Sequence, residues 1–160
     1  MIINQPKLDD LDTITEIYAS ARKFMAESGN PNQWTAGYPD YSDVANDMNS
    51  NNLYVIRDDD KIVGVFAFIL GEEPTYNVIE NGSWHYDLPY GTIHRIASTG
   101  EVKNISEIAF NYCLEKVDYL RIDTHQDNIP MQNAVKRFGF KECGTIYVRN
   151  GARIAFDYKR

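Results

Sequence analysis

The second half of the chain alternates between strand and helix patterns, and this alternation restricts the fold more than any other feature. Two apolar, β-branched runs, "GTIHRIAS" (91–98) and "YLRIDTH" (119–125), predict strands. Helical spacing follows each of them, over about 102–115 and about 130–138. A helix that crosses between neighbouring strands requires those strands to run parallel. The pattern therefore predicts a sheet with a parallel pair and with helices packed on it.

The remaining segments complete a mixed sheet. The predicted order is β-α-α-β-β-β-α-β-α-β-β, which is an α/β (α+β) arrangement of about seven strands flanked by four helices. The additional elements are a strand at 1–6, a helix from 8 that ends just before Gly29, a helix at about 42–49, a hairpin at 52–70, and a closing hairpin at 140–159 around Asn150 and Gly151. No repeat or linker interrupts them, so residues 1–160 are expected to form a single domain.

The charge balance and the length of the apolar runs restrict the classes of partner that the chain is expected to bind. Sixteen Lys and Arg against 23 Asp and Glu leave a net charge of −7, which disfavours nucleic acid. The longest apolar run, 62–70, is about half of what a membrane span requires, and no basic segment follows Met1. We therefore expect a cytoplasmic protein with no nucleic-acid or membrane partner.

The two cysteines indicate neither a metal site nor a covalent intermediate. Cys113 and Cys143 lie in apolar periodic segments and lack the spacing of metal ligands. We expect buried free thiols and no metal.

The stretch "DNIPMQNAVKRFGFKECG" (127–144), taken with the element order, resembles the GNAT superfamily of acetyl-CoA-dependent N-acetyltransferases. The resemblance covers essentially the whole chain. Asn128, Met131 and the pair at 139–140 match the family's segment after its fifth strand, whereas Val135 stands where a Tyr is usual. The resemblance implies the GNAT fold, acetyl-CoA as co-substrate and a place for Asn128 at the cofactor site.

The stretch "EVKNIS" (101–106) corresponds to the family's pyrophosphate-binding turn. The family pattern is Gln or Arg, two residues, Gly, one residue, then Gly or Ala. Glu101, Asn104 and Ser106 stand at these places, and all three depart from the pattern. Glycines let backbone N–H groups approach phosphates closely, and a carboxylate opposes them, although Lys103 partly offsets Glu101. The resemblance implies cofactor contacts from Lys103 to Ser106, with Ile105 included.

The strand 91–98 carries further implied contacts. In the family, backbone groups of this strand pair with the pantetheine arm, and one N–H stabilises the thioester oxyanion, which implicates Ile96, Ala97 and Ser98. Strand alternation places Thr92, His94, Ile96 and Ser98 on one face and Ile93, Arg95 and Ala97 on the other. Arg137, on the last helix, either contacts a CoA phosphate or belongs to a solvated face.

Three residues are candidate general bases. An amine of pKa near ~10 is only about 0.1% neutral at pH 7, and only the neutral amine attacks a carbonyl. His94 lies on the strand itself, while Asp123 and His125 end the neighbouring parallel strand. The alternatives are a structural role for His94 and helix capping by Asp123 or Asp127.

Two loops concentrate aromatic and acidic residues and indicate where an acceptor would bind. Trp34 and Tyr38 lie in the first loop, and Trp84 lies in the second, which spans 72–90 and also carries Glu72, Glu73, Glu80 and Asp87. Aromatic faces and carboxylates together favour a cationic ligand. We expect a small amine or a peptide amine, with simple coverage of the core edge as the alternative.

Two functions follow from these patterns. The first is an N-acetyltransferase in which a primary amine attacks acetyl-CoA directly. The alternative is a GNAT-like binding or regulatory module with a degenerate CoA site, because Glu101, Asn104, Ser106 and Val135 depart from the family pattern. The pattern leaves a homodimer open.

Overall fold

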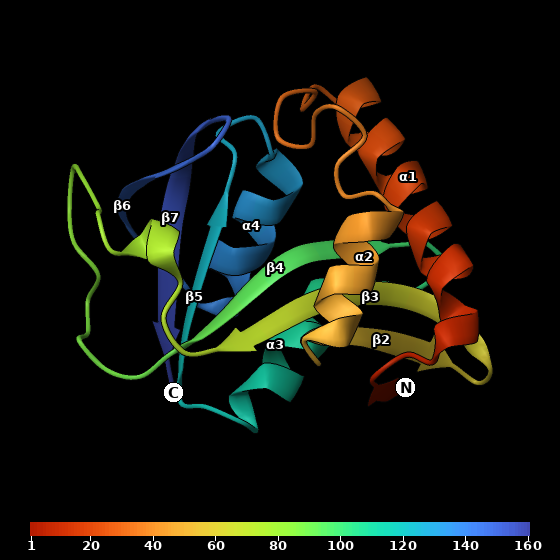
Figure 1. Cartoon of the computed structure of the whole chain (residues 1–160). Helices are drawn as coiled ribbons and strands as arrows, with labels where there is room; N and C mark the ends of the chain where they lie inside the picture. Colours follow the sequence, from red (N-terminus) through yellow and green to blue (C-terminus); the bar gives the residue numbers. More distant parts are fainter.

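The structure, a computed structural model, describes all residues from 1 to 160 and contains one seven-stranded mixed sheet. Helices cover both faces of the sheet, with α1 and α2 on one face and α3 and α4 on the other (Figure 1). The helices are α1 (Leu11–Glu27), α2 (Tyr41–Asn49), α3 (Ile105–Leu114) and α4 (Ile129–Phe138). The strands are β1 (Ile2–Asn4), β2 (Leu53–Asp58), β3 (Lys61–Leu70), β4 (Gly91–Ser98), β5 (Tyr119–Thr124), β6 (Lys141–Val148) and β7 (Gly151–Lys159). The predicted fold class and element order are confirmed.

The sheet divides where its only parallel pair separates. The strand order is β1-β2-β3-β4-β5-β7-β6, and every neighbouring pair except β4 and β5 is antiparallel. β4 and β5 pair only at Gly91 with Leu120 and at Thr92 with Arg121. Because β4 continues to Ser98 and β5 to Thr124, the two strands diverge beyond these pairs, and the sheet opens between them.

A bulge in β4 makes the predicted alternation of its faces wrong. Val65 pairs with Ala97 and Ala67 pairs with His94, so two residues of β4 stand opposite Phe66 alone. One of them, Arg95, has a φ of 52°, in the left-handed region. The side chain of Ile96 consequently packs with the α3 and α4 core beside Ile93, while Arg95 reaches Asp47 of α2.

The helix α3 begins three residues later than the sequence predicts. Its N-cap, Asn104, has a φ of 64° and a ψ of 32°, so the residues from Val102 onward form a turn before Ile105. The long segment 71–90 stays mostly irregular, as expected. It contains one short 3-10 helix, Pro74–Tyr76, and it touches the sheet through an isolated bridge between Glu80 and Thr145.

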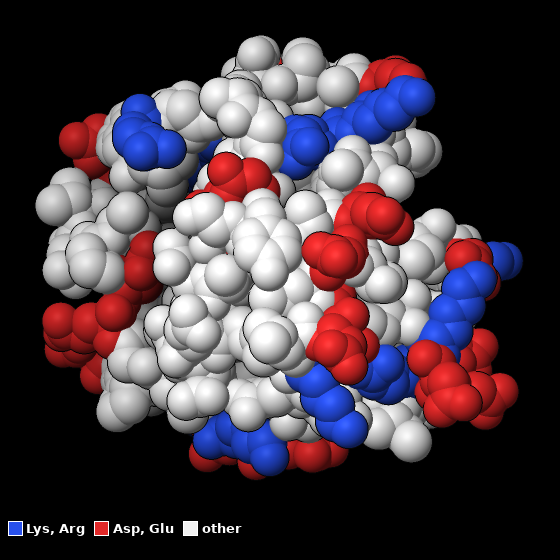
Figure 2. Space-filling model, turned by 45° about the vertical axis from the view of Figure 1, so that its right-hand side comes forward, with Lys and Arg blue, Asp and Glu red and all other residues white.

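The distribution of charge on the surface and the character of the helices agree with the net negative charge and the short apolar runs of the sequence. Acidic and basic side chains are interspersed on the face shown in Figure 2, and no continuous basic area covers it. None of the helices has the length and apolar character needed to cross a membrane. Both cysteines are free and buried, as predicted.

Candidate active site

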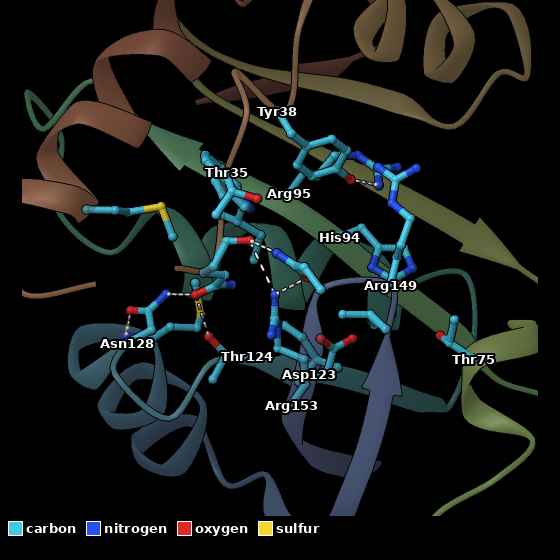
Figure 3. Close-up of a pocket in the computed structure, with 18 of the residues that line it drawn as sticks. Thr35, Tyr38, Thr75, His94, Arg95, Asp123, Thr124, Asn128, Arg149 and Arg153 are labelled. Atoms are coloured by element: carbon cyan, nitrogen blue, oxygen red, sulfur yellow. Dashed lines mark hydrogen bonds between the residues drawn. The ribbon is translucent and has the colours of Figure 1, made fainter. Parts of the chain in front are cut away.

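A large cavity, with a volume of about 680 Å³, lies where β4 and β5 diverge. β4 contributes His94 and Ile96, and β5 contributes Asp123. The loop between α1 and α2 and the turn between β6 and β7 both line the cavity (Figure 3), and they are joined there, because Asn150 donates to the backbone carbonyls of Asn32 and Gln33 at 3.3 Å. Segments far apart in the sequence therefore converge on one hollow beside the opened sheet.

His94 points into this cavity as a neutral side chain. Burial lowers the pKa of His94 to about 3, and the nearby Arg95 charge adds to the effect. The Nε2 atom lies 3.8 Å from Oε1 of Glu73, which is too long for a hydrogen bond. At neutral pH the imidazole therefore has an unprotonated nitrogen beside a carboxylate.

Asp123 is the second base candidate that the structure brings to the cavity. The hydroxyl of Tyr76 donates a hydrogen bond of 2.6 Å to Oδ2 of Asp123. Burial raises the pKa of Asp123, and the hydrogen bond from Tyr76 offsets only part of that rise. Its carboxyl group therefore holds a proton more readily than an exposed Asp does.

His125 does not line the cavity with the other two candidates. Its Nδ1 atom accepts a hydrogen bond of 3.0 Å from the backbone N–H of Asp127, in the turn that leads to α4. The expectation that Asp123 or Asp127 caps this helix is wrong, because Asn128 is the N-cap and its side chain accepts from the N–H of Met131. Asn128 itself lines the cavity.

Gln33, which the sequence did not single out, joins the elements around the cavity. Its Oε1 accepts hydrogen bonds from Asn30, Asn128 and Thr124, at 3.0, 2.9 and 3.4 Å. Its backbone carbonyl accepts from Nη2 of Arg153 at 3.3 Å. One glutamine thereby fixes the first loop to β5, to α4 and to β7.

A second cavity, of about 640 Å³, lies at the start of α3 and beside α4. It brings together five predicted cofactor residues, which are Ser98, Asn104, Ile105, Ser106 and Arg137. Ala97 and Lys103 do not line it, and Ala97 is instead buried in the core beneath α1.

The turn before α3 keeps the backbone shape that a glycine would favour. Asn104 occupies the left-handed region, where Asn is among the best tolerated residues after Gly. No side chain caps the helix, so the first-turn N–H groups lack a capping acceptor and suit an anion. Glu101 is paired with Lys61 at 2.6 Å, a partner that the sequence did not single out.

The aromatic residues divide between two places, which corrects their assignment to one acceptor site. Trp34 and Tyr38 line the large cavity, and the hydroxyl of Tyr38 accepts a 2.8 Å hydrogen bond from Arg95. Trp84 does not line it. Its ring lies 4.3 Å from the guanidinium carbon of Arg121, and its Nε1 donates to the carbonyl of Tyr76. This part of the loop therefore binds a cation of the protein itself.

One group of side chains outside both cavities has the atoms that a metal site requires. Donor atoms of His85, Cys143 and Asp157 all lie within 4.8 Å of one another. Each already has a protein partner, because Nδ1 of His85 lies 2.7 Å from Asp157 and 3.3 Å from the sulfur of Cys143. Burial raises the pKa of the Cys143 thiol, which disfavours the thiolate that binds metals.

Comparison with known proteins identifies the class of protein. No family model and no curated protein matches the chain. Its structure is similar to a GNAT-family acetyltransferase from Streptococcus agalactiae, with a TM-score of 0.91 and 27% identity over 99% of this chain and 95% of that one. It also resembles a putative acetyltransferase from Staphylococcus aureus (TM-score 0.72, 24% identity, 99% of both chains). A ribosomal-protein-alanine N-acetyltransferase from Brucella melitensis shares the fold (TM-score 0.66, 13% identity, 100% of both chains).

The sheet thus opens between β4 and β5, with one cavity at the divergence and another at the start of α3. The chain is a member of the GNAT superfamily.

Proposed function

We propose that the protein transfers an acetyl group from acetyl-CoA to a primary amine of a small molecule or peptide by direct attack. One observation carries the proposal: β4 runs past both cavities. Ile96 lines the cavity that holds His94, and Ser98, two residues further on, lines the cavity at α3. An extended ligand along β4 can therefore place phosphates at a helix N-terminus and a thioester beside titratable groups.

The residues around the second cavity fit the CoA phosphates. Backbone N–H groups in the first turn of α3 suit an anion, and Arg137 of the same cavity supplies a guanidinium. Asn104 and Ser106 can donate hydrogen bonds of their own where the family has glycine. Bound acetyl-CoA would supply the activated acetyl group, and the chain would supply its orientation.

The bulge in β4 suits the oxyanion that forms when an amine attacks a thioester. Arg95 and Ile96 stand opposite a single residue of β3, so the regular ladder of hydrogen bonds is interrupted there. A backbone N–H freed in this way, at a residue that lines the cavity, is the type of donor that stabilises an oxyanion. The attack forms the C–N bond, and collapse of the intermediate expels the CoA thiolate.

The amine must lose its proton around the attack. His94 is neutral at physiological pH, and Asp123 and Glu73 line the same cavity, so each can accept a proton directly or through water. The two carboxylates can also attract the ammonium form of the acceptor. The thiolate then takes up a proton from water, because buried Val135 replaces the usual Tyr of the family.

Calorimetric titration with acetyl-CoA at low and moderate salt tests the cofactor site. Binding near micromolar supports the proposal, and a screen of amines for CoA release then tests the transfer. His94→Gln and Asp123→Asn are expected to lower kcat by about a hundredfold for whichever residue is the base. No binding up to millimolar acetyl-CoA would reject the enzyme and favour the non-catalytic module, which the departures at Glu101 and Ser106 motivate.

A further inference from the structure

Arg153 of β7 is a buried cation without an anionic partner. Its exposed fraction is 5%, and it lines the large cavity. Its guanidinium donates only to neutral acceptors, at 2.8 Å to Asn150, 2.9 Å to the Ala152 carbonyl and 3.3 Å to the Gln33 carbonyl. No carboxylate lies within 4.0 Å of it, although Asp123 is near enough to raise its pKa against the effect of burial. A buried charge is costly without a counter-ion, so the site favours an anion.

Arg149, from the turn that joins β6 and β7, brings a second guanidinium to the same cavity. It forms no hydrogen bond and no ion pair within the protein, and it points into the cavity beside His94 (Figure 3). Arg95 differs from both, because its two nitrogens hold Asp47 at 2.8 and 2.9 Å and its charge is already balanced. Arg149 and Arg153 are therefore the cavity's available cations.

The same cavity also contains carboxylates without a cationic partner. Glu73 and Asp123 line it near His94, and no Lys or Arg nitrogen lies within 4.0 Å of either. The acidic and basic groups come from different elements, and no ion pair within 4.0 Å joins them, although Asp123 and Arg153 influence each other's pKa. A ligand that satisfies both sets carries a positive group and a negative group together.

We propose that the acceptor is a primary amine that also bears an anionic group, either a carboxylate or a phosphate. Arg149 and Arg153 bind the anionic group, because planar guanidinium groups suit the paired oxygens of both. The amine then lies toward His94, with Glu73 and Asp123 stabilising its ammonium form on entry. This inference rests on the proposed acetyl transfer and specifies its substrate class.

Matched pairs of amines test the inference. We would compare kcat/KM for 4-aminobutyrate with that for butylamine, and for phosphoethanolamine with that for ethanolamine. The wild type is expected to prefer at least one anionic member by about tenfold or more, and Arg149→Gln is expected to remove most of that preference. The readout is the ratio of kcat/KM within each pair, because a general loss of activity would lower both members alike. Lys23→Gln, which removes a charge from an exposed side chain of α1, is the control and should leave the preference intact.

Calorimetric binding of the same four amines, in the presence of CoA, separates the two proposals. A preference in the carboxylate pair alone or in the phosphate pair alone supports the inference and identifies the anion. Transfer with no preference in either pair overturns the inference and leaves the acetyltransferase standing. Selective binding that Arg149→Gln abolishes, without any transfer, supports the anion site and rejects the proposed reaction. If Arg149→Gln lowered kcat/KM for both members of a pair by equal factors, the inference would also be overturned.

Discussion

Arg121 and Arg153 are buried on neighbouring strands, β5 and β7, yet their surroundings differ completely. The guanidinium carbon of Arg121 lies 4.3 Å from the ring centre of Trp84 and 4.1 Å from that of Tyr90. It also donates to the hydroxyl of Tyr119 and to the carbonyl of Tyr86. No aromatic ring stacks on Arg153, and its hydrogen bonds go only to neutral acceptors that leave room for a ligand.

The difference shows how one residue type can serve the fold in one place and a site in another. The Tyr119 hydroxyl, which accepts from Arg121, donates at 2.7 Å to Asp157, and Asp157 also accepts from the backbone N–H of His85. This hydrogen-bond network joins the long loop 71–90 to the sheet, and its polar groups bind one another rather than a ligand. Arg153, by contrast, has no ion-pair partner within the protein, so an anionic ligand could gain binding energy by pairing with it.

Replacement of each arginine by methionine should separate the two roles most clearly. Arg121→Met loses stacking on two rings and two charged hydrogen bonds, so we expect the free energy of unfolding to fall by about 3 kcal/mol. Arg153→Met removes a buried charge without a counter-ion, so we expect a change within about 1 kcal/mol or a small gain. Urea unfolding measures both. Equal destabilisation by the two substitutions would contradict the comparison.

The aspartates of the two regions should respond to acid in opposite directions. Burial alone would raise the pKa of Asp157, but hydrogen bonds from His85 and Tyr119 outweigh it and leave the pKa lowered. Its stabilising effect is therefore complete above the ordinary value of 3.8 and is lost as the pH falls through its lower folded pKa. Asp123 has a raised pKa, so its penalty is complete above that folded pKa and is relieved as the pH falls toward 3.8.

The measurement is the unfolding free energy of Asp157→Asn and Asp123→Asn between pH 7 and pH 3. Asp157→Asn should cost about 2 kcal/mol at pH 7, with the deficit shrinking in acid. Asp123→Asn should cost less than about 1 kcal/mol at pH 7, and this cost should grow in acid, because protonation relieves a penalty that only the wild-type carboxylate carries. Parallel curves for the two variants would show that the pKa values do not differ in the stated directions.

The sequence predicted the fold because most of its signals are local. Periodicity within each segment identifies strands and helices, and the crossover helix between 91–98 and 119–125 requires their parallel pairing. The bulge at Arg95 escaped prediction because alternation assumes an unbroken ladder, and the start of α3 moved because Asn104 takes a conformation that single-sequence spacing does not reveal.

The candidate site was predictable only in part, for a related reason. His94 and Asp123 lie on two parallel neighbours, so the strand pairing alone places them near each other. Gln33 and Arg153 reach the cavity from a loop and a hairpin separated by 120 positions, and only the packed structure brings them together. Arg149 and Arg153, which flank the "NGA" turn, could have been recognised from the sequence as cavity residues, because a hairpin turn presents its flanking side chains to one region.

A smaller effect, on acetyl-CoA affinity, is expected from substitutions at the start of α3, where the second cavity lies. Asn104→Gly keeps the left-handed backbone and removes a side chain from the phosphate approach, so acetyl-CoA affinity should rise about threefold to tenfold, more so with Ser106→Gly added. Asn104→Ala is the control, since alanine disfavours this conformation and should cost about 1 kcal/mol of stability. Calorimetric titration gives the affinities. No gain with glycine would contradict the assignment of this turn to the cofactor.

The smallest effect is expected at the exposed ion pair between Lys61 and Glu101, in which Lys61 balances a carboxylate near the turn before α3. Lys61→Met leaves the Glu101 carboxylate without its partner at 2.6 Å, so its repulsion of a bound phosphate should increase. Because both side chains are largely exposed, acetyl-CoA affinity should fall only about twofold to threefold. The loss should disappear at high salt, and Glu101→Gln should reverse its sign. A loss that salt leaves unchanged would place the cause in the fold of the β2–β3 turn.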